Sequence, residues 1–396
     1  MTPILRWLSR RFTDGRLVIE CPDVDDIVVG SGSPTARLRF KDRAVLHWVL
    51  RDPQMRFPEA YVEGLWEPED DDLMPVLEVA MRNSSHLLSP KTRALRVLRA
   101  RLGELNSAVS AKRNIQHHYD IDTPVYRLFL DQDLHYSCAY FPQPEMSLEA
   151  AQQAKCALIA RKLHLRPGAR VLDIGCGWGS NALYLARHYD VHVTGVTLSE
   201  NQCAIARERA EAAGLSDRVS FRLEDYRQTQ GQFDAIVSIG MFEHVGRPQY
   251  PVFFDRVRDR LKPDGVALLH TIGSRHPPDQ GNPWIRKYIF PGGQIPAASE
   301  VLAPLERSGL WMTDLEVLRL HYATTLAHWH ARFQKNRVAI ADIMGERFCR
   351  MWRFYLQASE ATFRWGGLAV FQLQLARSLD RLPLTRNYLF SDTVLG

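Results

Sequence analysis

The chain contains 396 residues, of which 45% are hydrophobic and 24% are charged, and its formal net charge is +5. This length predicts two domains that each bury a core, and the composition is that of a soluble globular protein. The net charge is too small to indicate nucleic-acid binding. No run reaches the ~20 apolar residues that cross a bilayer, and the N-terminus lacks an apolar signal region, so we expect a cytoplasmic protein.

The first hundred residues predict a small α+β domain. Short apolar runs separated by Asp, Gly, Ser and Pro predict strands, and helical patterns follow them. The predicted strands are residues 17–19, 27–29 and 36–40, and the predicted helices are residues 44–50 and 73–81. We place this domain at residues 1–90, followed by a basic linker helix at residues 91–113 and a larger domain at residues 114–396.

Two segments mix basic and apolar residues in an amphipathic pattern. They are residues 5–11, with three arginines beside leucine and tryptophan, and residues 91–101, with five basic residues among leucines and valine. Such helices bind anionic membrane surfaces, and a solvated basic helix face has the same pattern. The pattern alone leaves both interpretations open.

From residue 145 onward, helical and strand patterns alternate along the chain. The helices are residues 150–163, 180–188, 199–213 and 253–261, and the strands are residues 170–174, 191–196, 219–223, 235–239 and 266–271. This alternation predicts a doubly wound, Rossmann-like parallel sheet with ligands at the carboxyl ends of its strands. Two segments depart from it as helical or loop insertions. Residues 277–296, rich in Pro and Gly, predict a lid or substrate loop, and residues 322–379 predict mostly long amphipathic helix rich in aromatic residues.

Residues 171–179 (Val-Leu-Asp-Ile-Gly-Cys-Gly-Trp-Gly) predict a strand that enters a glycine-rich turn and a helix. Such a turn lets a ligand lie against bare backbone. The glycines do not follow the G-x-G-x-x-G spacing of dinucleotide sites, and the next strand ends at Thr197 where a dinucleotide site has an acidic residue. With Gln202 after the second strand and Glu224 and Asp225 after the third, the pattern favours S-adenosylmethionine over NAD.

Six motifs then follow one another along the chain. They are residues 136–141 (Tyr-Ser-Cys-Ala-Tyr-Phe), 171–179, 195–202, 238–246, 288–293 and 321–330. In order and spacing they resemble the cyclopropane-fatty-acid synthases, a family of S-adenosylmethionine-dependent methyltransferases that includes the mycolic acid cyclopropane synthases. The resemblance covers residue 112 to the C-terminus. Residues 59–66 are similar to the lipid-binding N-terminal domain of the full-length bacterial synthases.

The resemblance implies that a methylene group passes from S-adenosylmethionine to the cis double bond of unsaturated phospholipid acyl chains. Methyl transfer to an alkene leaves a carbocation, and a proton must then leave the new methyl group before the ring closes. Water would capture the cation, so the reaction needs an apolar pocket with aromatic faces. In this family a bound bicarbonate is understood to take the proton.

The resemblance also assigns site residues. For bicarbonate they are Cys138 and Ile272 through backbone groups, His270 and Tyr322 as donors, and Glu243 as the acceptor that orients the anion. For the cofactor they are Tyr119, Tyr136, Ser137, Gly175, Gly177, Thr197, Leu198, Gln202, Leu223, Glu224 and Ile239. No metal site is predicted, because His117 and His118 lack a third ligand at a useful spacing.

Several alternatives remain open. Some relatives quench the cation differently and give a methyl-branched or methylene product. Similar plant enzymes methylate small amines, but the lipid-binding-like N-terminal domain argues against such a substrate. A non-catalytic lipid-binding protein is a further alternative. The resemblance also suggests a homodimer and a peripheral position at the inner membrane surface.

Overall fold

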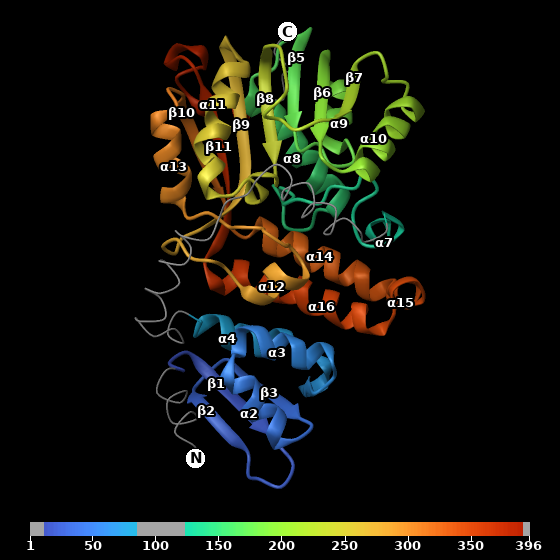
Figure 1. Ribbon diagram of the computed structural model, residues 1–396, viewed down its shortest axis with the longest axis vertical. Helices are drawn as coiled ribbons and strands as arrows, with labels where there is room; N and C mark the ends of the chain where they lie inside the picture. Colours follow the sequence, from blue (N-terminus) through green and yellow to red (C-terminus); the bar gives the residue numbers. More distant parts are fainter. Residues whose placement is uncertain (1–11, 85–122, 391–396) are drawn as a thin grey trace. The chain divides into compact units, whose positions relative to one another are not determined.

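The computed structural model describes residues 12–84 and 123–390 (Figure 1). Both basic segments, the predicted linker helix and Tyr119 lie outside these residues, as do His117 and His118. The described residues form two compact units. The first combines the N-terminal residues with residues 279–290 and 323–368, and the second contains the rest.

A four-stranded sheet forms the base of the first unit. Its strands are β1 (Gly15–Glu20), β2 (Ile27–Ser31), β3 (Thr35–Phe40) and β4 (Trp66–Pro68), in the order β2-β1-β3-β4. Its N-terminal helices are α2 (Arg43–Arg51), α3 (Pro53–Val62) and α4 (Met74–Arg82). The three strands and two helices predicted here are confirmed, while α3 and β4 were not predicted.

Helices from much later in the chain complete the first unit. They are α12 (Pro283–Tyr288), most of α14 (His321–Lys335), α15 (Arg337–Met344) and α16 (Glu346–Ala361). Phe354 on α16 lies 5.6 Å from the Tyr61 ring of α3 and 5.4 Å from the Trp284 ring of α12, between ring centroids. Tyr61 and Trp284 are fully buried. One aromatic cluster therefore joins three distant parts of the sequence in a single core.

The second unit contains a seven-stranded sheet with the order β10-β11-β9-β8-β5-β6-β7. Its strands are β5 (Ala169–Ile174), β6 (Val191–Thr197), β7 (Val219–Leu223), β8 (Phe233–Ile239), β9 (Leu261–Ser274), β10 (Trp311–Leu318) and β11 (Leu368–Ala376). The strands from β5 to β9 pair in parallel, which confirms the predicted sheet, and β10 and β11 pair antiparallel at one edge.

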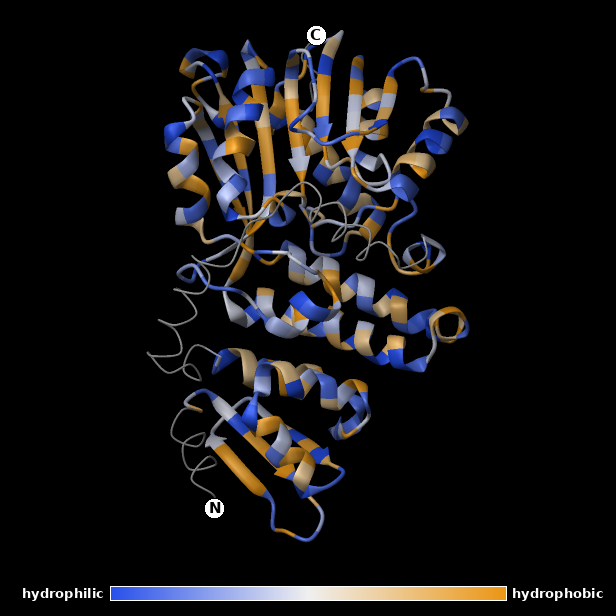
Figure 2. Ribbon diagram, viewed as in Figure 1, coloured by the Kyte–Doolittle hydropathy of each residue, from blue (hydrophilic) through white to orange (hydrophobic). Residues whose placement is uncertain are grey.

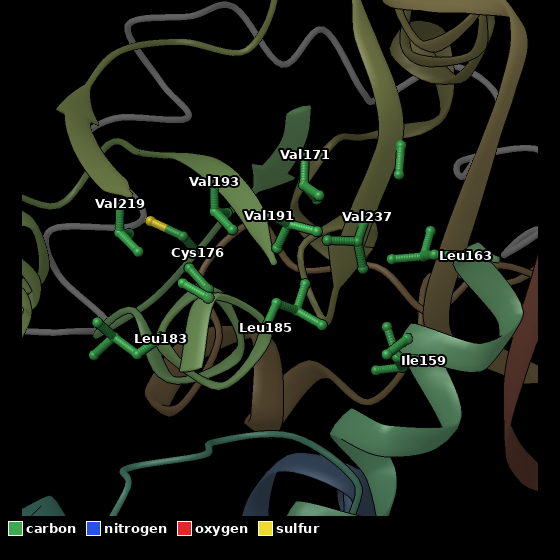
Figure 3. Close-up of a cluster of buried hydrophobic side chains, with 14 of the residues drawn as sticks. Ile159, Leu163, Val171, Cys176, Leu183, Leu185, Val191, Val193, Val219 and Val237 are labelled. Carbon is green, nitrogen blue, oxygen red and sulfur yellow. The ribbon is translucent and has the colours of Figure 1, made fainter. Parts of the chain in front are cut away.

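Helices cover both faces of this sheet. Its helices are α7 (Thr123–Arg127), α8 (Leu148–Leu163), α9 (Ser180–His188), α10 (Glu200–Ala212), α11 (Tyr250–Arg260) and α13 (Ala298–Arg307). Val171 packs into a core with α8, α9 and α10 (Figure 3), and its neighbour Leu172 packs into a second core with α11 and α13. Strands buried on both faces are largely apolar (Figure 2).

Two predicted segments differ from the structure. Residues 368–376 form strand β11 where we predicted helix, because Gly366 and Gly367 end the helical run and polar glutamines then alternate with apolar residues. The predicted loop at residues 277–296 contains α12, which Asn282 caps by accepting from the backbone N–H of Trp284 at 2.9 Å. None of the helices in the described ranges has the length and apolarity to cross a membrane.

The composite core of the first unit predicts a large effect for Phe354→Ala. Removing this ring leaves a cavity between α3, α12 and α16 and should lower the free energy of unfolding by about 3–5 kcal/mol. Chemical denaturation would measure the loss, and Leu384→Ala, at a fully exposed position, is the control and should change stability by less than about 0.5 kcal/mol. Equal stability of the two variants would contradict the composite core.

Candidate functional site

A pocket lies at the carboxyl ends of β5, β6 and β8, where ligands bind in sheets of this type. Most of the predicted cofactor residues line it: Tyr136, Ser137, Gly175, Gly177, Thr197, Leu198, Gln202, Glu224 and Ile239. Leu223 is not among the lining residues, and its side chain is 43% exposed.

The glycine turn after β5 leaves backbone, rather than side chains, at the pocket wall. Gly175 has a φ of +79°, and a Cβ atom there would lie 2.6 Å from Cγ of Met241. Its N–H donates to the carbonyl of Val196 on β6 at 2.9 Å. The turn is therefore held against the neighbouring strand, and only glycine fits this position.

The end of β6 forms a polar corner of the pocket. The Thr197 hydroxyl donates to Oε1 of Gln202 at 3.1 Å and accepts from the N–H of Ser199 at 3.2 Å. Ser199 caps α10, accepting from the N–H of Gln202 at 3.3 Å. Because all three side chains are buried, these bonds fix the geometry of the strand end.

Two buried ionisable residues in the pocket wall were not predicted from the sequence. Asp173 on β5 is 1% exposed, and burial raises the pKa of its carboxyl to about 7. Lys155 on α8 is fully buried, and its Nζ donates to Oγ of Ser137 at 2.9 Å. Asp173 could have been found from the sequence, because a carboxylate inside an apolar strand is unusual. Lys155 could not, because a lysine on a helix is normally solvated.

Glu243 forms the centre of a second group of predicted residues. The backbone N–H of Ile272 donates to its Oε1 at 2.6 Å, while its Oε2 is buried and makes no hydrogen bond within the described part of the chain. Burial raises the pKa of this carboxyl to about 7, although the bond from Ile272 opposes the shift. The structure thus holds one oxygen of Glu243 and leaves the other available to a ligand.

His270 is held as a neutral donor by a chain of hydrogen bonds. Lys162 Nζ donates to Oε1 of Gln372 at 2.7 Å, so the Gln372 amide nitrogen must face Nδ1 of His270, 3.1 Å away. Nδ1 then accepts and Nε2 carries the proton. Burial, together with the charges of Lys155 and Lys162, lowers the pKa of His270 to about 3.

Cys138 and Tyr322 lie on two segments that contact each other. Cys138 is buried one residue after the pocket residue Ser137, and its thiol donates to the carbonyl of Ala139 at 3.2 Å. Tyr322 is half-buried in the first turn of α14, where His321 Nδ1 accepts from the N–H of Phe141 at 3.0 Å.

The structure brings Glu243 and Ile272 into direct contact. His270 is joined to the pocket through its carbonyl, which accepts from the N–H of Gly240 at 2.9 Å. None of the five predicted bicarbonate residues is itself a lining residue of the cofactor pocket. Within residues 12–84 and 123–390, no three His, Cys, Asp or Glu side chains gather as a metal site.

The chain is similar to known lipid-modifying enzymes. The family model for mycolic acid cyclopropane synthetase matches residues 106–373. The cyclopropane-fatty-acyl-phospholipid synthase of Escherichia coli K12 is 41% identical over 352 residues, which cover 88% of this chain and 90% of the relative. The tuberculostearic acid methyltransferase UfaA1 of Mycobacterium tuberculosis is 34% identical over 371 residues, covering 89% of this chain and 86% of the relative.

A solved structure has the same fold. The mycolic acid cyclopropane synthase CmaA1, crystallised with SAH and CTAB, has a TM-score of 0.64 and 36% identity. The match covers 68% of this chain and 99% of CmaA1. It confirms the predicted Rossmann-like methyltransferase sheet.

The raised pKa of Glu243 predicts a pH-dependent loss of stability. The folded chain binds this proton more tightly than the unfolded chain, whose carboxyl titrates near 4.5. Stability should therefore fall as pH rises from about 4.5 to about 7, by a contribution on the order of 3 kcal/mol. Glu243→Gln removes the titrating group and should flatten that part of the profile.

Urea unfolding midpoints between about pH 5 and about pH 8 would measure this difference. Glu211→Gln, at an exposed position on α10, is the matched control and should run parallel to the wild type. If the Glu243→Gln profile has the wild-type slope, the pKa of the Glu243 carboxyl is not raised in the folded chain.

Proposed function

The chain belongs to the mycolic acid cyclopropane synthetase family and is an S-adenosylmethionine-dependent methyltransferase, and on this premise we propose that it forms cyclopropane rings in phospholipid acyl chains. In this reaction a methylene group is added across the cis double bond of an unsaturated chain. The match to the Escherichia coli synthase is longer than the segment from residue 106 to residue 396. It therefore includes N-terminal residues that lie outside the region matched by the family model. This extended similarity supports a phospholipid substrate.

The pocket at the sheet edge fits S-adenosylmethionine, because the turn at Gly175 and Gly177 presents backbone rather than side chains to a ligand. S-adenosylmethionine, when bound, supplies an electrophilic methyl group. Thr197 and Gln202 offer polar groups at the end of β6, and Glu224 follows β7. We assign the other predicted cofactor residues that line the pocket to the same role, and Tyr119 by the resemblance alone.

The single observation that supports a bound bicarbonate is the unpaired buried Oε2 of Glu243. Bicarbonate, when bound, supplies the base that removes a proton from the new methyl group. Oε2 can accept a hydrogen bond from the bicarbonate hydroxyl. His270 can donate a hydrogen bond to the anion from Nε2, because its Nδ1 is engaged by Gln372. Ile272 donates its N–H to Oε1 and so orients the carboxylate.

Cys138 and Tyr322 complete the proposed set. The backbone of Cys138 adjoins the pocket residue Ser137, and Tyr322 starts a helix that is hydrogen-bonded to the same segment through His321. A phenol and a backbone amide are suitable donors for an anion that is removed from water. Both residues would therefore keep the base in place without contributing charge.

The site also implies a position at a membrane. Acyl chains of phospholipids lie within the bilayer, and we propose that the enzyme binds its inner surface peripherally. Residues 1–90 would serve as a lipid-binding domain and residues 91–113 as a basic linker, ahead of a catalytic domain at residues 114–396. A homodimer stays an expectation from the resemblance.

A methyl-branched or methylene product is the second candidate. The similarity to the tuberculostearic acid methyltransferase, which covers 89% of this chain, favours it. Both candidates share methyl transfer to the alkene. Loss of a proton from the new methyl group with ring closure gives the cyclopropane, whereas a hydride shift before that proton leaves gives the methylene branch, and a saturated methyl branch needs a further hydride donor. Whether deprotonation precedes the hydride shift therefore decides the product.

Incubation with unsaturated phospholipid vesicles and S-adenosylmethionine tests both candidates. A cyclopropane and a methylene-branched chain have the same mass, so proton NMR of the extracted lipid must distinguish ring protons from exocyclic methylene protons, and both from the vinylene protons of unreacted substrate. We expect ring protons. Exocyclic methylene protons would select the second candidate, and lipid with vinylene protons alone would exclude both.

Glu243→Gln should lower the rate of ring formation by about a hundredfold or more, because the variant cannot accept the bicarbonate proton. Binding of S-adenosylhomocysteine should be unchanged, and Glu211→Gln should retain full activity. Bicarbonate-depleted buffer should slow the wild type, and added bicarbonate should restore it. A fully active Glu243→Gln variant would remove Glu243 from the mechanism.

A further inference from the structure

The wall of the cofactor pocket contains a buried lysine whose role the mechanism above does not use. Lys155 projects from α8, is fully buried and lines the pocket. Removing an ammonium group from water is costly unless an anion is nearby. The question is therefore which anion stabilises it.

A second buried lysine on the same helix is paired with a carboxylate, as buried lysines usually are. Lys162 lies two helical turns after Lys155 and is equally buried, but it forms an ion pair with Glu316 at 2.5 Å and a hydrogen bond to Gln372. For Lys155, the partner is the neutral hydroxyl of Ser137. No carboxylate in the described ranges forms an ion pair with it.

Two other basic side chains in the pocket wall are matched by carboxylates. Arg227 makes two hydrogen bonds to Asp225, at 2.9 and 2.5 Å, and His135 Nδ1 lies 2.9 Å from Asp131. Asp173 lines the same wall but forms no ion pair with Lys155. Asp131 and Asp173 attract the ammonium of Lys155 electrostatically, but it faces the pocket with no carboxylate of the described residues in ion-pair contact.

S-adenosylmethionine carries a sulfonium, an ammonium and a carboxylate, and only the carboxylate is attracted by a cation. We propose that Lys155 binds the carboxylate of the methionine portion of the cofactor, acting together with Ser137. This inference rests on S-adenosylmethionine as the cofactor and not on the lipid product.

The contacts of Ser137 support a shared role. Its Oγ accepts from Lys155, so its own O–H is left to donate to a ligand, and its carbonyl accepts from Nε2 of Gln152 at 3.0 Å. Two buried side chains of α8 therefore fix the segment from both sides. Cys138 follows directly, so the same lysine also positions the proposed bicarbonate segment.

Calorimetric binding of two ligands to the full chain tests the proposal. S-adenosylhomocysteine contains the amino acid carboxylate, and 5′-methylthioadenosine lacks it. Lys155→Met should weaken S-adenosylhomocysteine binding by about tenfold to a hundredfold, the effect of losing a hydrogen bond to a charged group. Binding of 5′-methylthioadenosine should change by less than about twofold.

Two variants separate charge from structure. Glu211→Gln, at an exposed position on α10, is the control and should leave both affinities unchanged. Lys155→Gln keeps a donor for Ser137 without the charge, so it should fold if Lys155→Met does not and should lose affinity for S-adenosylhomocysteine alone. Equal losses for both ligands, or no loss for either, would overturn the proposal.

Bicarbonate is the other source of a carboxylate-like anion, and each titration is therefore repeated with bicarbonate present and absent. A loss that depends on added bicarbonate would assign Lys155 to that anion and overturn our proposal. Failure of the wild type to bind either ligand would refute the cofactor itself. A failure of the lipid assay with normal binding would refute only the proposed product.

Discussion

The in-register pairing of parallel strands is the constraint on which the site depends. Ile174 on β5 is level with Val196 on β6 and with Ser238 on β8, and Ile239 is level with His270 on β9. Three strands therefore end at one edge of the sheet, and His270 of the longer β9 is level with their ends. The strand register fixes the glycine turn, the polar corner at Thr197 and His270 relative to one another, because a slip of one residue would move every side chain of a strand into the opposite core.

Burial at this edge sets the charge of the site before any ligand binds. It raises the pKa of both Glu243 and Asp173 to about 7 and lowers that of His270 to about 3. Burial also lowers the pKa of Lys155. An anion that enters beside Lys155 would favour its charged form, so ligand binding and ionisation are coupled at this residue. This coupling suits a reaction in which a cation forms and water must be excluded.

The sequence predicted the parts of the fold in which one physical pattern dominates. Strands β5, β6 and β8 are largely apolar on both faces, so their pattern was unambiguous. β11 was missed because it follows a long aromatic helix, and β10 because it is an edge strand with exposed apolar residues such as Trp311. The glycines alone predicted the cofactor turn, whereas the roles of Glu243 and His270 were predicted only from the family resemblance. Lys155 was missed because its burial arises from tertiary packing that no local pattern encodes.

The aromatic core of the first unit changes how the N-terminal residues should be understood. Tyr61 and Phe57 of α3 cover Phe354 of α16, and Arg350 of the same helix stacks 4.3 Å from the Tyr61 ring centroid while donating to the Tyr61 carbonyl. On α12, the hydroxyl of Tyr288 donates to Glu59 at 2.7 Å. In this chain, removing the N-terminal residues would expose these aromatic and charged surfaces of α12 and α16. The N-terminal residues are therefore a structural component of the helical insertions, and they cannot be treated as a separable appendage.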